Sequence, residues 1–400
     1  MSVHPAPARP TISRGLTLLI AVMGSVAVGN LYWAQPLLRL IAEDLEVSTA
    51  TAGWLVTATQ IGYATGIVLV VPLGDFLNRR LLIPALLACS AVALLACAFA
   101  PTFGALLAAI ALLGLSTVAG QVAIPLAGDL ADDAGRGRVI GTVMAGFLSG
   151  TLISRTLSGL ISQAAGWRAI YVVAAVATLI LAALAYRSIP VLPDRPRLRY
   201  PALLASVGTV IRRHRMVRWS LLLSALQFAA FMMFWTSLTF LLSAPPFAYP
   251  VIVIGLFGLA GLPGAVAAQR TGVLHDRGLS LPAIGVTWGV ALVSFGLLGL
   301  AQDSVPLLIA GIVLLHIALF PLTVLISSRL FALVPEARSR VNTAMITTNF
   351  VTGAVASAVV APLWSSGGWP AITLAELAVC ALALAVWALG RRGPLIAPAA

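Results

Sequence analysis

Three side chains within the long apolar stretches of this sequence could take part in ionic or proton chemistry. Arg155 and Glu376 carry formal charge, and the imidazole of His316 is a group that ordinarily titrates near neutral pH. Because a charge in an apolar environment is costly, a residue that keeps one there is a candidate for function. Arg155 could bind an anionic solute or pair with a mobile proton site. The alternative is that its long stem carries the guanidinium to the polar headgroups.

Glu376 and His316 also have structural interpretations. Glu376 lies about 10 Å along a helix from Trp369, where an interfacial or helix-packing acid is expected. A lone histidine such as His316 is often a hydrogen-bonded packing residue, and proton coupling is the alternative.

A set of uncharged polar side chains lies in the same apolar stretches. These side chains could line a cavity for an amphipathic, mostly apolar solute, or they could serve only in helix packing. The set comprises Asn30, Tyr32, Gln35, Gln60, Gln121, Gln227, Trp235 and Asn349.

The halves of the chain resemble each other. The polar stretch Val71–Arg80 (VPLGDFLNRR) returns as Gly272–Gly278 (GVLHDRG), and Gly166–Ile170 (GWRAI) returns as Gly368–Ile372 (GWPAI). In the first pair, Leu73 and Asp75 correspond to Leu274 and Asp276. A period of half the chain indicates two similar halves rather than a solenoid, which repeats every 20 to 50 residues or so.

Composition indicates that lipid surrounds most of the chain. Hydrophobic residues make up 60% of it, charged residues 9%, and the mean hydropathy is +1.04, which exceeds what a globular core could bury. The net charge of +12 comes from arginine alone, and these arginines lie in loops rather than beside stacking aromatics, which argues against nucleic acid. The three cysteines lie in apolar runs, where packing is favoured over disulfides or metal.

A hydrocarbon core about 30 Å thick needs roughly 20 apolar residues per crossing. The sequence predicts helical crossings, because a backbone in lipid must satisfy its own hydrogen bonds. The twelve predicted spans are 16–38, 50–73, 81–100, 104–127, 139–162, 167–186, 217–242, 247–268, 281–301, 305–327, 341–364 and 369–389.

Arginine placement predicts that both termini are cytoplasmic, because that topology leaves only Arg39, Arg155 and Arg168 off the cytoplasmic side. The end of the central linker is amphipathic enough to lie on the membrane surface. The predicted divisions are an N-terminal tail (1–15), a first six-helix bundle (16–186), a linker (187–216), a second six-helix bundle (217–389) and a C-terminal tail (390–400).

With these features, the sequence resembles the major facilitator superfamily of secondary transporters. Its most specific marker is the family loop Gly-x-Leu-Ala-Asp-Arg-x-Gly-Arg-Arg, which is matched by Leu73, Asp75, Arg79 and Arg80, and in the second half by Gly272, Leu274, Asp276 and Arg277. The resemblance implies an all-α membrane protein whose 12 transmembrane helices form two pseudo-symmetric six-helix bundles. It also implies that one half rocks against the other around a midplane site.

Within the superfamily, Asn30–Leu38 (NLYWAQPLL), PLGD, SRTLSG and GWRAIY are similar to the drug and sugar efflux branch of arabinose-efflux-permease-like proteins. Two family patterns are altered. Ile110 stands where many proton-coupled members carry an arginine, and the span-five antiporter pattern reads Gly146, Gly150, Thr151, Ser154 and Arg155.

The resemblance also gives the loop charges a role as a conformational latch. We expect Asp75 to face the N-terminus of span eleven near Val341, where free N–H groups favour a carboxylate. Arg79 and Arg80 are expected to pair with Asp129, Asp132 or Asp133, with Asp276 and Arg277 as the second copy of the loop. Such contacts would hold the cytoplasmic ends of the two halves together.

The first hypothesis for function is proton-coupled efflux of a small hydrophobic, drug-like or sugar-like compound across a bacterial inner membrane, by a monomer without cofactor or metal. Uptake of a small organic anion with Arg155 as counter-charge is the second, and a membrane sensor that binds without transport is the third. An enzyme is disfavoured because the sequence has no Walker loop and no His-Glu-x-x-His motif.

Overall fold

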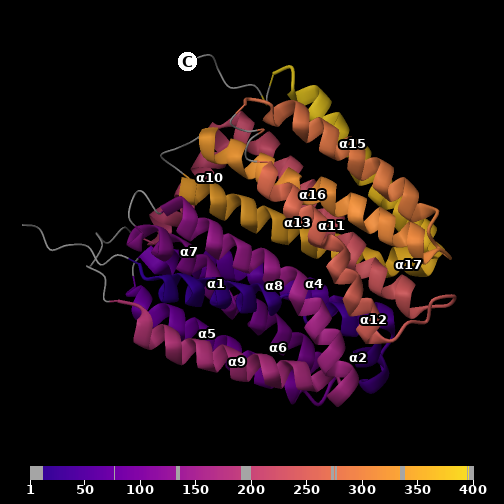
Figure 1. The fold of residues 1–400 in the computed structure, drawn as a ribbon, viewed down its shortest axis with the longest axis horizontal. Coiled ribbons are helices and arrows are strands. Elements are labelled where there is room, and N and C mark those ends of the chain that lie inside the picture. The colour runs from indigo at the N-terminus through magenta and orange to yellow at the C-terminus, as the bar shows by residue number, and fades with distance from the viewer. Residues whose placement is uncertain are drawn as a thin grey trace, which may run out of the picture.

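The computed structural model describes residues 12–75, 77–131, 136–190, 200–271, 274, 277–333, 338–393 and 395. In these ranges every regular element is a helix. The long helices run lengthwise beside one another, with the N-terminal half (indigo to magenta) below and the C-terminal half (pink to yellow) above in Figure 1.

The N-terminal half contains helices of very different length because three of its crossings are broken by short turns. Its elements are α1 (Arg14–Gly29), η1 (Gln35–Leu37), α2 (Leu38–Asp44), α3 (Thr49–Ala52), α4 (Trp54–Leu69), η2 (Val71–Asp75), α5 (Arg79–Ala98), α6 (Phe103–Ser116), α7 (Ala119–Leu130), α8 (Arg136–Ala165) and α9 (Trp167–Ser188).

The C-terminal half follows a short amphipathic helix, which corresponds to the predicted surface segment of the linker. Its elements are α10 (Tyr200–Arg213), α11 (Arg215–Ser243), α12 (Val251–Leu256), η3 (Phe257–Gly261), α13 (Leu262–Arg270), α15 (Ser280–Gly299), α16 (Val305–Leu333) and α17 (Arg338–Gly390). Helix α10 packs against α11, α17 and η2, so it touches both halves.

Ten helical segments in the described ranges are long and apolar enough to cross a membrane. One of them runs through α17, where Gly367 and Gly368 leave the helical conformation and separate two crossings. Helix α1 is shorter, and it continues past a turn at 30–34 into η1 and α2. One further crossing from α17 and one from α1 bring ten to the twelve that the sequence predicts.

Hydrogen bonds join the turn that interrupts the first crossing, after α1, to the turn that interrupts the fourth crossing, between α6 and α7. The Asn30 amide donates to Thr117 Oγ1 at 3.2 Å, and Thr117 Oγ1 donates to the Ala27 carbonyl at 3.0 Å. The Trp33 indole donates to Asn30 Oδ1 at 2.8 Å. The irregular backbone between α1 and η1 therefore faces the break between α6 and α7, within protein rather than lipid.

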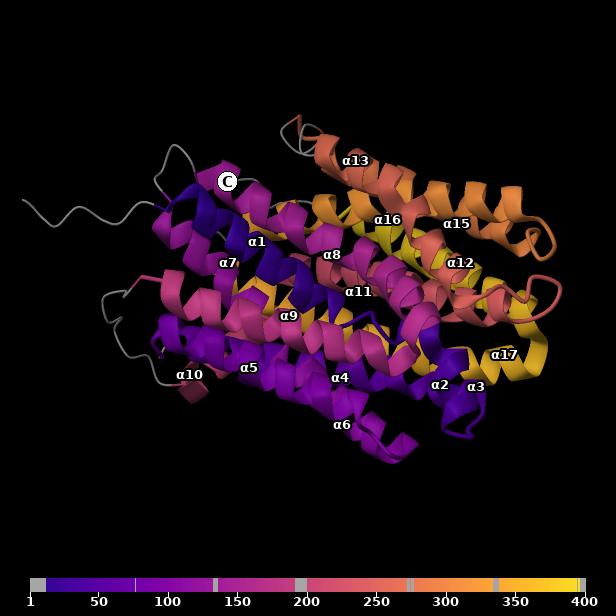
Figure 2. The same ribbon diagram turned by 60° about the horizontal axis from the view of Figure 1, so that its bottom comes forward.

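Each half is built from helix pairs that recur in the other half. Helix α1 packs on α8, α4 on α6 and α5 on α9, while α11 packs on α17 and α13 on α16 (Figure 2). The halves meet where α4 contacts α17 and where α8 contacts α12 and η3. Glycines allow the closest approaches, since a Cβ at Gly146 or Gly150 of α8 would meet the backbone of Ala21 or Ser25 of α1.

Candidate functional site

The guanidinium of Arg155 lies at the centre of a buried polar cluster. Its side chain comes from α8, and only 2% of the residue is exposed. Nε and Nη2 donate to Gln35 Oε1 at 3.1 and 2.8 Å, and Nη1 donates to the Thr151 carbonyl at 2.5 Å. The guanidinium therefore does not extend to the headgroups, and the snorkelling alternative is wrong.

A local break in the first crossing positions Gln35. This residue opens the 3₁₀ turn η1, and Pro36 follows it in the first turn, where a missing backbone N–H is tolerated. Because regular α-helix stops at Gly29, the chain turns and presents Gln35 toward α8. The polar run that suggested a cavity in the sequence thus supplies the acceptor for Arg155.

Aromatic rings complete the surroundings of Arg155. The guanidinium carbon lies 4.1 Å from the centroid of the Trp235 ring, 4.6 Å from that of Tyr32 and 5.8 Å from that of Phe231. Ring faces attract a cation, and more strongly where water is excluded. Within the described part of the chain, no carboxylate pairs with Arg155, so the positive charge is balanced only by dipoles and ring faces.

His316 and Arg155 both contact the ring of Trp235. The His316 ring centroid is 5.5 Å from that of Trp235 and 5.1 Å from that of Phe320, and the residue is fully buried in α16. Nδ1 lies 2.8 Å from the Ile312 carbonyl, which can only accept, so Nδ1 carries the hydrogen. The lone pair of a neutral ring is then on Nε2, which has no hydrogen-bond partner among the described residues.

Two other buried polar atoms near Arg155 are also unsatisfied in the described structure. They are Oε1 of Gln60 and Nε1 of Trp235. Leaving a buried polar group without a partner costs about 1–3 kcal/mol, so such atoms are uncommon in native structures unless a ligand or water meets them. Trp235 supplies a donor beside the cation, and Gln60 and His316 supply an acceptor and a free ring nitrogen in the side chains next to it, so the cluster is suited to a polar group of a bound molecule.

Met232 of α11, in the C-terminal half, contacts two polar side chains of the N-terminal half. Its sulfur accepts from the Gln60 amide at 2.9 Å and lies 4.0 Å from the Gln35 amide. Sequence reasoning missed Met232 and Phe231, because an apolar side chain on a membrane helix gives no signal of whether it faces lipid or a site.

The remaining members of the predicted polar set lie apart from Arg155. Asn30 joins the two helix breaks, as described above. Gln121 donates to the Tyr63 hydroxyl at 3.1 Å, and Gln227 donates to the Leu319 carbonyl at 3.4 Å. With its amide oriented to satisfy both groups, Asn349 donates to Ser224 Oγ at 2.9 Å. These contacts serve helix packing in this conformation.

Glu376 is buried in the second crossing of α17 rather than placed at an interface. Only 1% of the residue is exposed, and neither carboxyl oxygen has a partner among the described residues. Of its two structural interpretations, the packing position is the one found.

The predicted pairing of Arg79 forms, but it does not join the two halves. Arg79 Nη1 lies 2.9 Å from Asp129 Oδ2, and Arg79 Nε donates to the Gly74 carbonyl at 2.8 Å. Both partners belong to the N-terminal half, since Arg79 begins α5 and Asp129 lies at the end of α7. The expectation that this contact clamps one half to the other is therefore wrong for this pair.

The other predicted latch residues are only partly described. Arg80 lies 5.9 Å from the ring centroid of Tyr186, again within the N-terminal half, and Arg277 is exposed. Asp132, Asp133 and Asp276 lie outside the described residues, as does the side chain of Asp75.

The helices and the buried cation define a class of protein: a multi-pass, all-helical membrane protein with a polar site between two similar halves. The sequence matches the Major Facilitator Superfamily over residues 18–301, and the chain belongs to this superfamily. It is thus a secondary transporter and not an enzyme.

Known relatives agree with this assignment. The chain is 37% identical over 378 residues to the uncharacterized transporter YgaY of Escherichia coli O157:H7, covering 94% of this chain and 95% of the relative. Its fold is similar to that of a bacterial homologue of the human lysosomal transporter Spinster in an inward-facing, occupied conformation, with a TM-score of 0.79, 14% identity, and coverage of 99% and 100%. A point mutant of the nucleoside transporter NupG gives a TM-score of 0.74 at 14% identity, covering 93% of this chain and 99% of NupG.

Proposed function

We propose that this protein exports a small amphipathic compound that carries one anionic group, and that it couples this movement to protons. The observation that carries the proposal is the buried guanidinium of Arg155, which has no carboxylate partner among the described residues. A charge in the membrane is costly unless it is paired. Binding of an anion at this position would supply the missing partner.

The rings around Arg155 favour a substrate that is mostly apolar. Tyr32, Phe231 and Trp235 offer flat apolar faces, while Gln60 Oε1 and Trp235 Nε1 offer one acceptor and one donor. A few convergent polar groups in an apolar wall are typical of sites that orient a small organic molecule.

His316 is the proposed proton carrier. Its Nε2 is free among the described residues, and its ring contacts Trp235, which also contacts the Arg155 guanidinium. Because two nearby cations repel each other, a proton on His316 would raise the energy of the positive charge on Arg155. The protonation state of His316 would thus alter the state of the Arg155 site, and export requires that the proton and the substrate occupy the protein in alternation.

The direction of transport is proposed from the likeness to the efflux branch. One of the stretches similar to that branch is Asn30–Leu38 (NLYWAQPLL), which contains Gln35. We further propose that the protein works as a monomer in a bacterial inner membrane with both termini cytoplasmic, following the arginine distribution. Uptake of the same organic anion is the competing hypothesis.

Proteoliposomes with an imposed pH gradient would test the proposal. A panel of amphipathic carboxylates and their uncharged amides should show movement of the carboxylates only, opposite to the proton flux. Movement in the same direction as protons would replace export with uptake. Binding without flux would indicate a sensor, and equal movement of the amides would rule out Arg155 as the anion site.

A further inference from the structure

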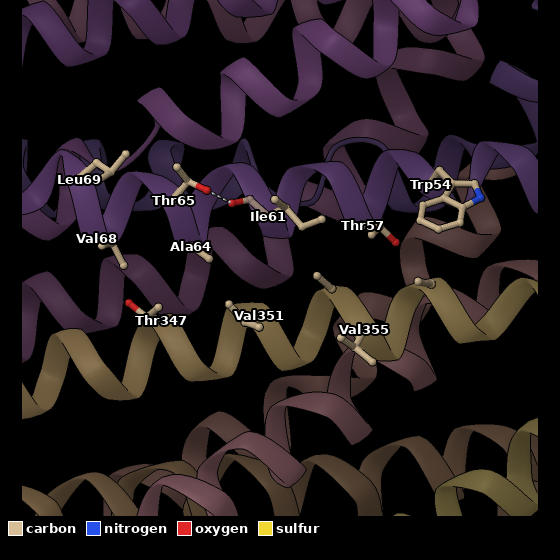
Figure 3. Close-up of a pocket in the computed structure, with 12 residues that line it drawn as sticks. Trp54, Thr57, Ile61, Ala64, Thr65, Val68, Leu69, Thr347, Val351 and Val355 are labelled. Carbon is tan, nitrogen blue, oxygen red and sulfur yellow. Dashed lines mark hydrogen bonds between the residues drawn. The ribbon is translucent and has the colours of Figure 1, made fainter. Parts of the chain in front are cut away.

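A groove between the two halves opens on the side of the molecule, away from the Arg155 cluster. It lies between α4 and the first crossing of α17, and has a volume of about 630 Å³ (Figure 3). Its rim includes Ile61, Val351 and Val355, which are 53%, 49% and 60% exposed. Its floor includes Thr57 and Ala64, which are buried.

The other faces of α4 are already occupied, which fixes where the groove points. Gln60 and Tyr63 face the centre, where Gln60 contacts Met232 and Tyr63 contacts Phe350. Gly62 packs against the backbone of α6. With 3.6 residues per turn, Ile61 lies on the remaining face. In a membrane, that face looks into the lipid.

Two hydroxyl groups break the apolar lining of the groove. Thr57 of α4 is 3% exposed, and its Oγ1 has no hydrogen-bond partner among the described residues; the same is true of Thr347 Oγ1 on α17. In Figure 3 the Thr57 hydroxyl points toward α17 and the Thr347 hydroxyl points toward α4. Buried hydroxyls without partners cost free energy. Both oxygens are covered in this conformation, so a hydrogen-bonding group that enters between α4 and α17 reaches them when these two helices move apart.

A track of polar side chains leads from the groove to Arg155. Thr57 and Gln60 are neighbours on α4, one turn apart. The amides of Gln60 and Gln35 both approach Met232 Sδ, and Gln35 Oε1 accepts from Arg155. Thr57, Gln60 and Gln35 thus form a series of polar side chains between the groove and the cation.

We propose that this groove is a lateral port, and that it admits a single-chain carboxylic acid that is dissolved in the bilayer. This inference rests on the proposed function and names its substrate class. The chain of the acid lies in the apolar groove, its protonated carboxyl group bonds to Thr57 or Thr347, and the ionised carboxylate pairs with Arg155 after transfer. The proton released in this step passes to His316 Nε2 and from there to the cytoplasmic side before the carboxylate leaves on the other side, so that proton and anion separate.

The two hydroxyls decide which lipophilic molecules the groove selects. Lipid tails are as apolar as the groove, so an alkyl chain alone gains little by leaving the bilayer. A carboxyl group gains hydrogen bonds that lipid tails cannot offer, at about 0.5–1.5 kcal/mol each. Along α4 the groove extends from Trp54 to Leu69, which corresponds to about 22 Å of helix and accommodates one extended chain.

Photolabelling of the full-length protein in phosphatidylcholine nanodiscs tests the port without measuring transport. The probes are a palmitic acid analogue with a diazirine in its chain and a diazirine-bearing alkane of equal length. The acid should form adducts within 54–69 and 347–358. Thr57→Val should lower labelling by the acid several-fold, by the loss of one hydrogen bond, and leave labelling by the alkane unchanged.

A matched pair of tryptophan variants tests occupancy. Val351→Trp fills the groove and should lower labelling by the acid about tenfold, which corresponds to 1.4 kcal/mol. Val293→Trp on α15, at a position 58% exposed and outside the groove, should leave it unchanged. Adducts spread evenly over the lipid-facing helices, or equal labelling of both variants, would overturn the port.

The labelling and the vesicle assay separate the two proposals. If the acid labels the groove but vesicles move no organic anion, the transport proposal fails and the groove assignment stands. If organic anions move at wild-type rates in Val351→Trp and the label avoids the groove, the port is wrong and the transport proposal stands.

Discussion

Gln35 Oε1 accepts two hydrogen bonds from the Arg155 guanidinium, at 3.1 Å from Nε and 2.8 Å from Nη2. The pair joins the broken first crossing to α8 within the N-terminal half. An amide oxygen carries only a partial charge, so it orients the guanidinium without neutralising it. Arg155 is thereby held in place with its positive charge still available.

A carboxylate in place of the Gln35 amide should neutralise Arg155 and so prevent it from binding an anionic solute. Gln35→Glu has nearly the same shape and would form a bidentate ion pair with Arg155. We expect the variant to fold, to melt at or above the wild-type temperature, and to lose binding of anionic amphiphiles by at least about 100-fold, because the pair already satisfies the cation. Isothermal titration in detergent measures the affinity, and differential scanning fluorimetry measures the melting temperature.

Gln35→Leu is the control for this change. It removes the acceptor without adding charge, so Arg155 loses two charged hydrogen bonds worth about 1.5–3 kcal/mol each. We expect a lower melting temperature with anion binding retained at a reduced affinity. Equal loss of binding in both variants would show that orientation, and not charge, is what Gln35 supplies.

His316 should be required for the pH dependence of transport and not for substrate binding. His316→Asn can still bond to the Ile312 carbonyl but cannot take up a proton near neutral pH. We expect loss of pH-driven substrate movement, while the dissociation constant at neutral pH changes by less than about threefold, or 0.7 kcal/mol. Flux into proteoliposomes at several imposed pH gradients measures the effect.

His214→Asn provides the matched substitution, since His214 is an exposed residue that precedes α11. It should transport as the wild type does. Undiminished pH-driven transport by His316→Asn would remove this residue from the proton path.

The charged residue of the site could be predicted from the sequence, but the apolar residues that surround it could not. Arg155 was recognisable as a cation within an apolar span, whereas Met232 and Phe231 resembled any lipid-facing side chain. The pairing of Arg79 with Asp129 was also predictable, because both flank the same end of adjacent crossings. Both residues also fall within the predicted first bundle (16–186), so the sequence alone indicates that this pair does not join the two halves.

Among the predicted latch contacts, that between Asp75 and span eleven would join the two halves, so the hypothesis is tested at Asp75. The Arg79–Asp129 pair stays within the N-terminal half, and the Asp129 side chain is 43% exposed. Asp129→Asn should cost at most about 1 kcal/mol of stability and leave the rate of transport near that of the wild type. Asp75→Asn should insert normally and lose transport, if its carboxylate meets the N-terminal end of the span-eleven helix. Comparable transport by the two variants would contradict the latch.

Close contact between α1 and α8 should limit the stability of the N-terminal half. A Cβ at Gly150 would overlap the backbone carbonyl of Ser25, whereas a Cβ at Gly141, nine residues earlier on the same helix, meets no atom within 4 Å. Gly150→Ala should therefore push α1 away and destabilise the protein by about 1–3 kcal/mol.

Gly141→Ala makes the same chemical change without the overlap. It should be neutral or stabilising by up to about 1 kcal/mol, because alanine favours the helix. The half-life of the folded protein at elevated temperature in detergent, followed by size-exclusion chromatography, compares the two variants. Equal half-lives would mean that α1 and α8 do not pack as closely as the backbone positions of Ser25 and Gly150 require.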